Sequence, residues 1–472
     1  MHPSGKNLLL INPWIYDFTA YDLWSQPLGL LYLASFLRIH GYNISYIDCL
    51  NSPDKSENPG KKKYGVGNYR RQIIESPRIL KDIPRKFARY GITEDSFLKQ
   101  LKHVPPPDAI LVTSIMTYWS LGPQHVVTLV KKAFPGVPVI LGGIYASLLP
   151  RHAQEVVKAD FVVEGPGEWR TLQLLSSLLG VEIDPQIITR KLDDYPYPAF
   201  DLISNPGYLC VMTARGCPFN CSFCAQKKVA MKFTQRDPDE VIKELEYHYK
   251  KYKLRDFAFY DDALFINKEN HVKRILQGII DYRLPIRFHT PNGLFARDVD
   301  EQLAMLMYQA NFKTIRLSFE TANERRQKDM NNKISNNGMR TAVKNLISAG
   351  YAARDIDAYV IMGLPGQSLD EILESIIFIN NLGVQVQMAS YSPIPGTLDF
   401  QRAVDSGLIS EGIDPLLTNK TIFPLKNDTL DYETFRKIRI FSQILNDAAR
   451  QGLALFARNN IGKSLSRVLK RL

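Results

Sequence analysis

Three closely spaced cysteines are the residues of this chain whose types and spacing best suit chemistry. Cys217, Cys221 and Cys224 are separated by three and then by two residues. Three thiolates at this spacing can bind three irons of a 4Fe-4S cluster, and the fourth iron is then open to a small molecule. An electron-transfer cluster would use a fourth cysteine, but the two that remain, Cys49 and Cys210, do not continue the run. The pattern therefore predicts an iron–sulfur cluster with one open iron.

A zinc site and a set of free thiols are the alternative interpretations of these cysteines. Structural zinc takes four ligands, usually two CxxC pairs or one CxxC pair with two histidines. The loop supplies three cysteines. Its composition therefore favours the cluster.

The loop resembles the cluster loop of the radical S-adenosylmethionine (radical SAM) enzymes, including an aromatic residue, Phe223, before the last cysteine. In that family the open iron chelates the amino and carboxylate groups of SAM. The resemblance implies that Phe223 belongs to the SAM site. It also implies reductive cleavage of SAM to methionine and a 5′-deoxyadenosyl radical, which abstracts hydrogen from an unactivated carbon. The protein's part is then to orient the reactants and to exclude water and oxygen.

Six β/α repeats are predicted around the cysteine loop. A complete barrel of this kind has eight repeats over about 250 residues, and a six-unit partial barrel is the radical SAM architecture. The count therefore agrees with the cysteine motif. The strand-like segments are 208–214, 256–262, 286–290, 314–320, 357–366 and 386–391.

Polar residues stand at the carboxyl ends of these strands, where such barrels place their active residues. The resemblance assigns them to SAM. Asp261 and Asp262 stand where many members have a Gly-Gly-Glu that holds the amino group, so which of the two binds is left open. Ser318 and Glu320 match positions near the SAM carboxylate and ribose. The turn at 362–366, with Gly363 and Pro365, matches the adenine turn.

His289 is the one imidazole at a predicted strand end. We interpret it as a candidate catalytic residue that accepts a proton or a hydrogen bond from the substrate. A structural histidine with satisfied hydrogen bonds is the alternative.

The first part of the chain alternates short apolar strands with helices. The strand-like segments are 7–14, 43–48, 108–115, 137–143 and 161–165. Such alternation predicts a parallel, doubly wound, flavodoxin-like sheet. Ligands of these sheets lie at the carboxyl ends of the strands. The candidate residues at those ends are Thr113, Ser114, Gly142, Gly143, Tyr145, Glu164 and Gly165.

This half resembles the cobalamin-binding domain that precedes the radical SAM domain in one large subgroup. The matching stretches are Pro27–Ala34, Gly142–Pro150 and Glu164–Glu168. The resemblance implies that cobalamin is a further cofactor. The Asp-x-His-x-x-Gly motif of many cobalamin proteins is absent, because Cys49 and Leu50 follow Asp48. A domain with an empty or repurposed pocket is the alternative, and Tyr145 is either beside the corrin or a core aromatic residue.

The domain organisation that follows is α/β throughout. Residues 1–170 form the cobalamin-type domain, with an insertion at 51–107. Residues 171–206 form a linker, 207–396 the partial barrel, and 397–472 a helical C-terminal region. The insertion is rich in Lys and Arg, which either meet a phosphate-bearing ligand or are simply solvated.

Composition and charge place the chain among globular proteins of a reducing compartment. It has 472 residues, 45% hydrophobic, with five cysteines and a net charge of +11. It has no run of about 18 uncharged apolar residues and no recognisable signal peptide, so we expect it in the cytoplasm. Residues 461–472 have the pattern of a basic amphipathic helix, which either touches a membrane surface peripherally or docks on the protein.

The sequence therefore predicts a radical SAM enzyme that carries out cobalamin-dependent methylation of an unactivated carbon. The expected partners are a small-molecule or lipid-like substrate and a low-potential electron donor of the flavodoxin or ferredoxin type. No nucleic acid is expected. The alternatives are a radical SAM cyclase, rearrangement or oxidation enzyme, with or without cobalamin, and a non-catalytic corrinoid or Fe–S binding protein.

Overall fold

The computed structural model describes residues 5–54, 58–60, 62–187, 189, 191–230, 232–427 and 430–451. The chain forms two compact units. The first comprises Met1–Cys210, Ala225–Met231 and Asp414–Leu417, and the second Val211–Cys224, Lys232–Ile413 and Thr418–Leu472. Each unit is built on its own parallel sheet.

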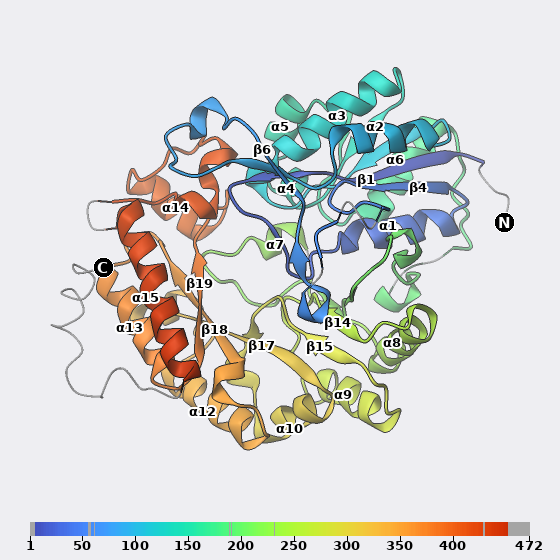
Figure 1. The fold of residues 1–472 in the computed structure, drawn as a ribbon. Helices are drawn as coiled ribbons and strands as arrows, with labels where there is room; N and C mark the ends of the chain where they lie inside the picture. The colour runs from blue at the N-terminus through green and yellow to red at the C-terminus, as the bar shows by residue number, and fades with distance from the viewer. Residues whose placement is uncertain are drawn as a thin grey trace. The chain divides into compact units, whose positions relative to one another are not determined.

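The sheet of the first unit has five strands in the order β10-β9-β8-β1-β4 (Figure 1). All its pairings are parallel, and helical crossovers connect each strand to the next one in the chain. This is the doubly wound, flavodoxin-like sheet that the sequence predicted. Its elements are β1 Asn7–Asn12, α1 Leu28–Ile39, β4 Asn43–Asp48, α2 Glu94–His103, β8 Ala109–Val112, α3 Leu121–Ala133, β9 Val139–Leu141, α4 Ile144–Leu148, α5 Pro150–His152, β10 Phe161–Val162 and α6 Gly167–Leu179.

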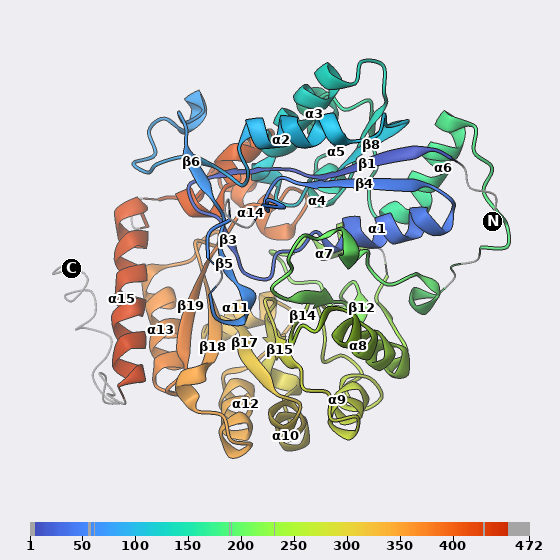
Figure 2. The same cartoon turned by 45° about the vertical axis from the view of Figure 1, so that its right-hand side comes forward.

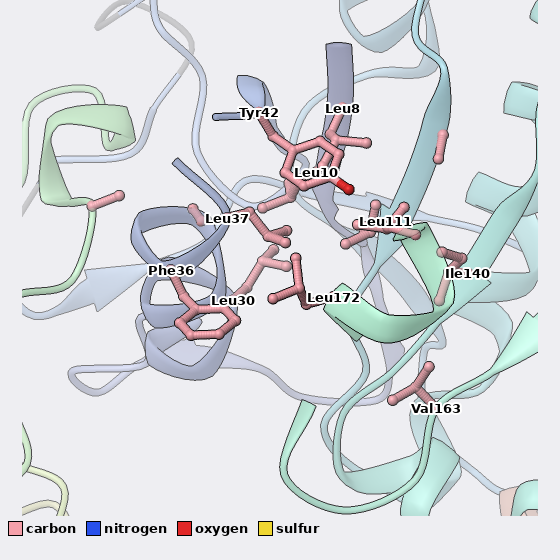
Figure 3. Close-up of a cluster of buried hydrophobic side chains, with 14 residues drawn as sticks. Leu8, Leu10, Leu30, Phe36, Leu37, Tyr42, Leu111, Ile140, Val163 and Leu172 are labelled. Atoms are coloured by element: carbon pink, nitrogen blue, oxygen red, sulfur yellow. The ribbon is translucent and has the colours of Figure 1, made fainter. Parts of the chain in front are cut away.

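One face of this sheet packs against α1 and α6. Leu30 and Leu37 of α1 point toward Leu10 of β1 and Leu172 of α6 (Figure 3). Burial of each such side chain stabilises the fold by about 1.5–3 kcal/mol. This core fixes the strands whose carboxyl ends carry the predicted ligand residues.

The insertion after β4 is more regular than the sequence indicated. Its strands β6 (Arg71–Ile73) and β7 (Ala88–Tyr90) pair antiparallel with each other, and β7 also pairs with β2 (Ile15–Asp17). Strand β5 (Gly67–Asn68) pairs with β3 (Tyr21–Asp22). Helix α2 lies inside the predicted insertion and is the crossover between β4 and β8. The insertion into the doubly wound order therefore ends before α2 begins.

The second unit contains six parallel strands in the order β11-β14-β15-β17-β18-β19, and β16 pairs with β17. This is the predicted partial barrel, with helices along the outside of the sheet (Figure 2). Its elements are β11 Leu209–Val211, β12 Ala214–Arg215, β13 Thr234–Gln235, α8 Pro238–Tyr252, β14 Asp256–Phe259, α9 Val272–Asp281, β15 Arg287–His289, β16 Leu294–Phe295, α10 Glu301–Gln309, β17 Phe312–Glu320, α11 Glu324–Asp329, α12 Asn336–Ser348, β18 Ile356–Met362, α13 Leu369–Asn380, β19 Gln385–Ser390, α14 Leu398–Asp405 and α15 Tyr432–Arg450.

Helix α15 covers the open edge of the barrel sheet at β19. The buried Asn446 side chain accepts a hydrogen bond from the Val386 N–H (2.8 Å) and donates one to the Val386 carbonyl (2.9 Å). It therefore stands in for a neighbouring strand and protects the edge from further pairing. In the described part of the chain, no helix has the length and apolar character needed to cross a membrane. The helix predicted at 461–472 lies outside the described residues.

Candidate active site

The cysteine loop leaves the barrel between two short strands. β12 pairs antiparallel with β13, and residues 216–225, all described, form neither helix nor strand. A turn bond from the Cys224 N–H to the Cys221 carbonyl (3.1 Å) brings the last two cysteines together. Cys217 and Cys221 are half-buried and Cys224 is exposed. The loop therefore presents its thiols from one irregular segment at the start of the barrel.

The surroundings of the loop favour the protonated form of two of its thiols, Cys217 and Cys221. Burial raises the pKa of Cys217, and it raises that of Cys221 to about 11 against the opposing charge of Lys333. Metal ligation must therefore displace protons from these groups. Among the described residues, no three His, Cys, Asp or Glu side chains converge on a single metal ion. A 4Fe-4S cluster does not need that convergence, because each thiolate binds its own iron, so the donor set fits a cluster.

Phe223 and Ser222 attach the loop to the rest of the second unit. The Ser222 hydroxyl donates to Asp399 Oδ2 (2.7 Å), and the Asp399 N–H donates to the Ser222 carbonyl (3.0 Å). Phe223 packs against the buried cluster that contains Ile361, Leu364 and Tyr391. Its ring thus packs next to the turn predicted to hold adenine, where it anchors the loop.

The two adjacent carboxylates after β14 have different surroundings. Asp261 is 4% exposed and accepts hydrogen bonds from the Thr213 N–H (3.1 Å) and the Thr213 hydroxyl (2.6 Å). Asp262 lies close enough to Cys217 for its charge to raise the pKa of that thiol. Asp261 is thus engaged by the barrel scaffold, whereas Asp262 contributes to the electrostatics of the cysteine loop.

This carboxylate pair predicts an unusual pH dependence of stability in the cofactor-free protein. Burial raises the pKa of Asp261 to about 6, and burial followed by the Asp261 charge raises that of Asp262 to about 7. The folded state then binds more protons than the unfolded state between pH ~4 and ~7, so stability falls as pH rises, by about 1 kcal/mol per pH unit for each group. Chemical denaturation at a series of pH values measures this slope.

Asp262→Asn is expected to flatten that pH dependence. The matched control is Asp281→Asn, at an exposed carboxylate at the end of α9, which should leave the slope unchanged. An unchanged slope in Asp262→Asn would contradict the assignment.

Ser318 and Glu320 lie at the carboxyl end of β17, where the pairing with β18 shifts register. Glu320 has a left-handed backbone conformation (φ +71°), which costs a non-glycine residue about 1–2 kcal/mol and redirects its side chain. Its carboxylate is buried and pairs with Lys333 Nζ at 3.2 Å. Both charges influence the pKa of Cys221. The bulge therefore brings Glu320 and Lys333 to the cysteine loop.

The turn after β18 is held by a glutamine. Gln367 Oε1 accepts hydrogen bonds from the Gly363 N–H (2.8 Å) and the Leu364 N–H (3.2 Å). The Pro365 carbonyl accepts from Arg326 Nη1 at 3.4 Å. The turn is thus rigid before any ligand binds.

His289 has a structural environment. Its ring is fully buried, Nε2 contacts Asp256 Oδ1 and Nδ1 contacts Thr314 Oγ1, both at 2.9 Å. Asp256 begins β14 and Thr314 lies near the start of β17, so the side chain is directed away from the carboxyl ends of the strands. Burial lowers its pKa. Of the two interpretations of His289, these contacts favour the structural histidine over the catalytic one.

The predicted ligand residues of the first unit lie on three connected loops after β8, β9 and β10. Ser114 Oγ donates to the Gly142 carbonyl (2.7 Å), and the Gly165 N–H donates to Ser147 Oγ (2.8 Å). Gly143 has φ +96°, and a Cβ there would lie 2.2 Å from the Ser114 carbonyl oxygen. The contact between these loops therefore by itself requires a glycine at position 143.

The other predicted ligand residues at the carboxyl ends of these strands differ in their burial. Thr113 follows β8, and the carbonyl of Glu164 accepts from Arg170 Nη1 (2.8 Å). Tyr145 is fully buried and its hydroxyl bonds His152 Nδ1 (2.7 Å). Since protein covers its ring, this burial favours the interpretation of Tyr145 as a core aromatic residue over a place beside the corrin.

Two residues that approach the cysteine loop were absent from the sequence prediction. Lys333 lies between α11 and α12, and no motif marks it. Thr213 lies inside the cysteine stretch and is fully buried. Its position four residues before the first cysteine is the feature of the sequence that could have indicated a role at the loop.

Residues 211–379 match the radical SAM superfamily. The cytidylyl-2-hydroxyethylphosphonate methyltransferase of Streptomyces wedmorensis is 22% identical over 470 residues, which cover 86% of this chain and 83% of that protein.

Two solved structures share the fold over most of the chain. The radical SAM methyltransferase TsrM of Kitasatospora setae, solved with cobalamin and a 4Fe-4S cluster, has a TM-score of 0.63 at 15% identity, covering 85% of this chain and 78% of that one. The cobalamin-dependent radical enzyme OxsB, solved with aqua-cobalamin, has a TM-score of 0.64 at 13% identity, covering 94% and 72%. The predictions of family and fold class are thus confirmed. Residues 211–379 of this chain are therefore a domain that matches the radical SAM superfamily, and the fold of the chain is similar to those of TsrM and OxsB.

Proposed function

We propose that the protein is a radical SAM methyltransferase that uses a 4Fe-4S cluster, SAM and cobalamin to methylate an unactivated carbon of a small-molecule or lipid-like substrate. One observation carries the proposal: the likeness to methyltransferases spans both units. The Streptomyces methyltransferase aligns with 86% of the chain, and the TsrM fold covers 85%. A protein that shared only the radical SAM chemistry would need only the barrel half.

The chemistry is divided between the cofactors and the chain. When bound, the cluster and SAM supply a carbon-centred radical, and cobalamin supplies a transferable methyl group. The chain supplies Cys217, Cys221 and Cys224 as cluster ligands. Their loop is anchored by Phe223 and Ser222, and Lys333 offsets the negative charge that the thiolates bring.

For SAM, the surroundings favour Asp262 over Asp261 as the acceptor for the ammonium group. The Asp261 carboxylate already accepts from Thr213, whereas Asp262 acts on Cys217. Glu320 and Ser318 are the candidates for the carboxylate and ribose side of SAM, and the turn with Gly363 and Pro365 for adenine. That turn is held by Gln367, so it needs little reorganisation to bind.

For cobalamin, the support comes from the loops after β8, β9 and β10. These loops are bonded to one another, and two apolar side chains, Met116 and Ile144, are exposed beside them. Exposed apolar groups at the carboxyl edge of a parallel sheet suit a flat hydrophobic ligand. Within this proposal the electron donor is of the flavodoxin or ferredoxin type and the enzyme is cytoplasmic. The domain limits are those given by the sequence, except that the insertion ends before α2.

Anaerobic reconstitution with iron, sulfide and cobalamin tests this function. The loaded enzyme is incubated with reductant, a cell extract and SAM labelled in its methyl group, and both 5′-deoxyadenosine and labelled products are measured. Formation of both supports the methyltransferase. Formation of 5′-deoxyadenosine with no labelled product would replace methylation by another radical reaction, such as ring closure or oxidation. Absence of both would contradict an enzymatic role.

A further inference from the structure

A network of buried polar groups surrounds Thr213 at the stem of the cysteine loop. Thr213 lies two residues after β11 and four residues before Cys217, and its exposed fraction is 0%. Its N–H, its carbonyl and its hydroxyl are each bonded to another residue. Of these contacts, only those of the hydroxyl depend on the threonine side chain.

The side chain of Thr213 links a carboxylate to an imidazole. Its hydroxyl donates to Asp261 Oδ1 at 2.6 Å, and the same oxygen lies 2.9 Å from His271 Nε2. Since the hydroxyl proton is given to the carboxylate, the oxygen accepts from His271, which fixes the histidine with its proton on Nε2. Asp261 and His271 are both buried, so each depends on Thr213 for a hydrogen bond that water cannot replace.

The main chain of the same residue is held from the other side. The Thr213 carbonyl accepts from the Arg236 N–H at 2.9 Å. Arg236 Nη1 donates to the Met212 carbonyl (3.3 Å) and pairs with the buried Glu244 of α8. The stem of the loop is thus bonded, through buried groups, to the residues that follow β13 and β14, to the residue before α9 and, through Arg236, to α8.

We propose that Thr213 is a positioning residue for the iron–sulfur cluster, and that Asp261 and His271 act through it. The inference rests on the proposed cluster at Cys217, Cys221 and Cys224. The loop itself has no helix or strand between residues 216 and 225, so its geometry depends on its two ends. Groups one bond removed from the ligands commonly set how firmly a metal site is held. Asp261 is in this view part of the support for the cluster.

The test compares four reconstituted proteins: wild type, Thr213→Val, Thr213→Ser and Thr290→Val. Valine has the shape of threonine without its hydroxyl, and serine restores the hydroxyl. Thr290 is an equally buried threonine of the barrel whose hydroxyl donates to a backbone carbonyl, Thr314 O at 2.9 Å, so it controls for a generic loss of one hydrogen bond. Each protein is assayed for iron per chain and for the rate at which a chelator removes the visible cluster absorption. Circular dichroism monitors folding.

Thr213→Val is expected to lose its cluster to the chelator about tenfold or more faster than wild type, while Thr213→Ser and Thr290→Val stay close to wild type. Asp261→Asn provides a second route to the same defect and is expected to behave like Thr213→Val, which keeps the inference testable if the valine variant does not fold. A folded Thr213→Val with wild-type cluster retention would overturn the inference. A wild-type protein that takes up no iron would instead contradict the proposed function itself.

Discussion

Replacing Cys221 with alanine is expected to abolish both the visible absorption of the reconstituted cluster and the formation of 5′-deoxyadenosine. Cys221 is the middle ligand of the proposed site. In the proposed cluster one iron has no protein ligand, and without Cys221 another iron would also lack a thiolate. The half-buried loop has no other described cysteine to replace it, because Cys49 and Cys210 are buried in the first unit. Iron content, absorption and chromatography of the SAM cleavage products measure the effect.

The matched control is Cys49→Ala. Cys49 is fully buried, and burial raises the pKa of its thiol well above the ordinary value, which is the state of an inert structural thiol. This variant should therefore keep its full iron content and its product. Equal loss of iron in both variants would mean that metal uptake does not depend on the loop.

Asp262→Asn is expected to weaken SAM binding by about tenfold to a hundredfold, since it would remove the charge-assisted hydrogen bond that we propose between Asp262 and the SAM ammonium group. The cluster should form normally in this variant. The dependence of 5′-deoxyadenosine formation on SAM concentration measures the change, with iron per chain as the internal reference.

The corresponding variant of the neighbouring residue, Asp261→Asn, distinguishes the role of Asp261 from that of Asp262. It is expected to reduce the retention of the cluster, because Asp261 is bonded to Thr213, and to leave SAM affinity nearly unchanged in the fraction that is loaded. Weak SAM binding in Asp261→Asn, with normal binding in Asp262→Asn, would reverse the assignment made here.

Much of the fold was predictable because it depends on local patterns. Apolar segments of strand length alternated with helices in both halves, and this indicated two parallel sheets and six barrel strands. Helix α2 was missed inside the insertion, although Thr93 caps it and Phe97 and Leu101 form its buried face. The small antiparallel strands β2, β6 and β7 were missed because each has three residues, too few to establish a period.

The candidate site was predictable only in part, for the same physical reason. The three cysteines lie within eight residues of one another, so their spacing alone indicated a cluster. His289 and Tyr145 also looked suitable by residue type and position. Their burial and their bonds to Asp256, Thr314 and His152 arise from packing, which residue type does not specify.

For the cysteine loop, some features could be predicted from the sequence and others required the tertiary structure. The sequence by itself predicted the three cysteine ligands and determined the fold class and the match of residues 211–379 to the radical SAM superfamily, because chelation and strand period act over short stretches of chain. The tertiary structure decided which residues lie next to that loop and interact with it. In the folded chain, Asp261 is hydrogen-bonded to Thr213, which lies 48 residues away in the sequence. The charge of Asp262 raises the pKa of Cys217, and the charges of Glu320 and Lys333 influence the pKa of Cys221. These roles depend on which distant groups are buried together, since a buried polar group must find its hydrogen-bond partner wherever the fold provides one.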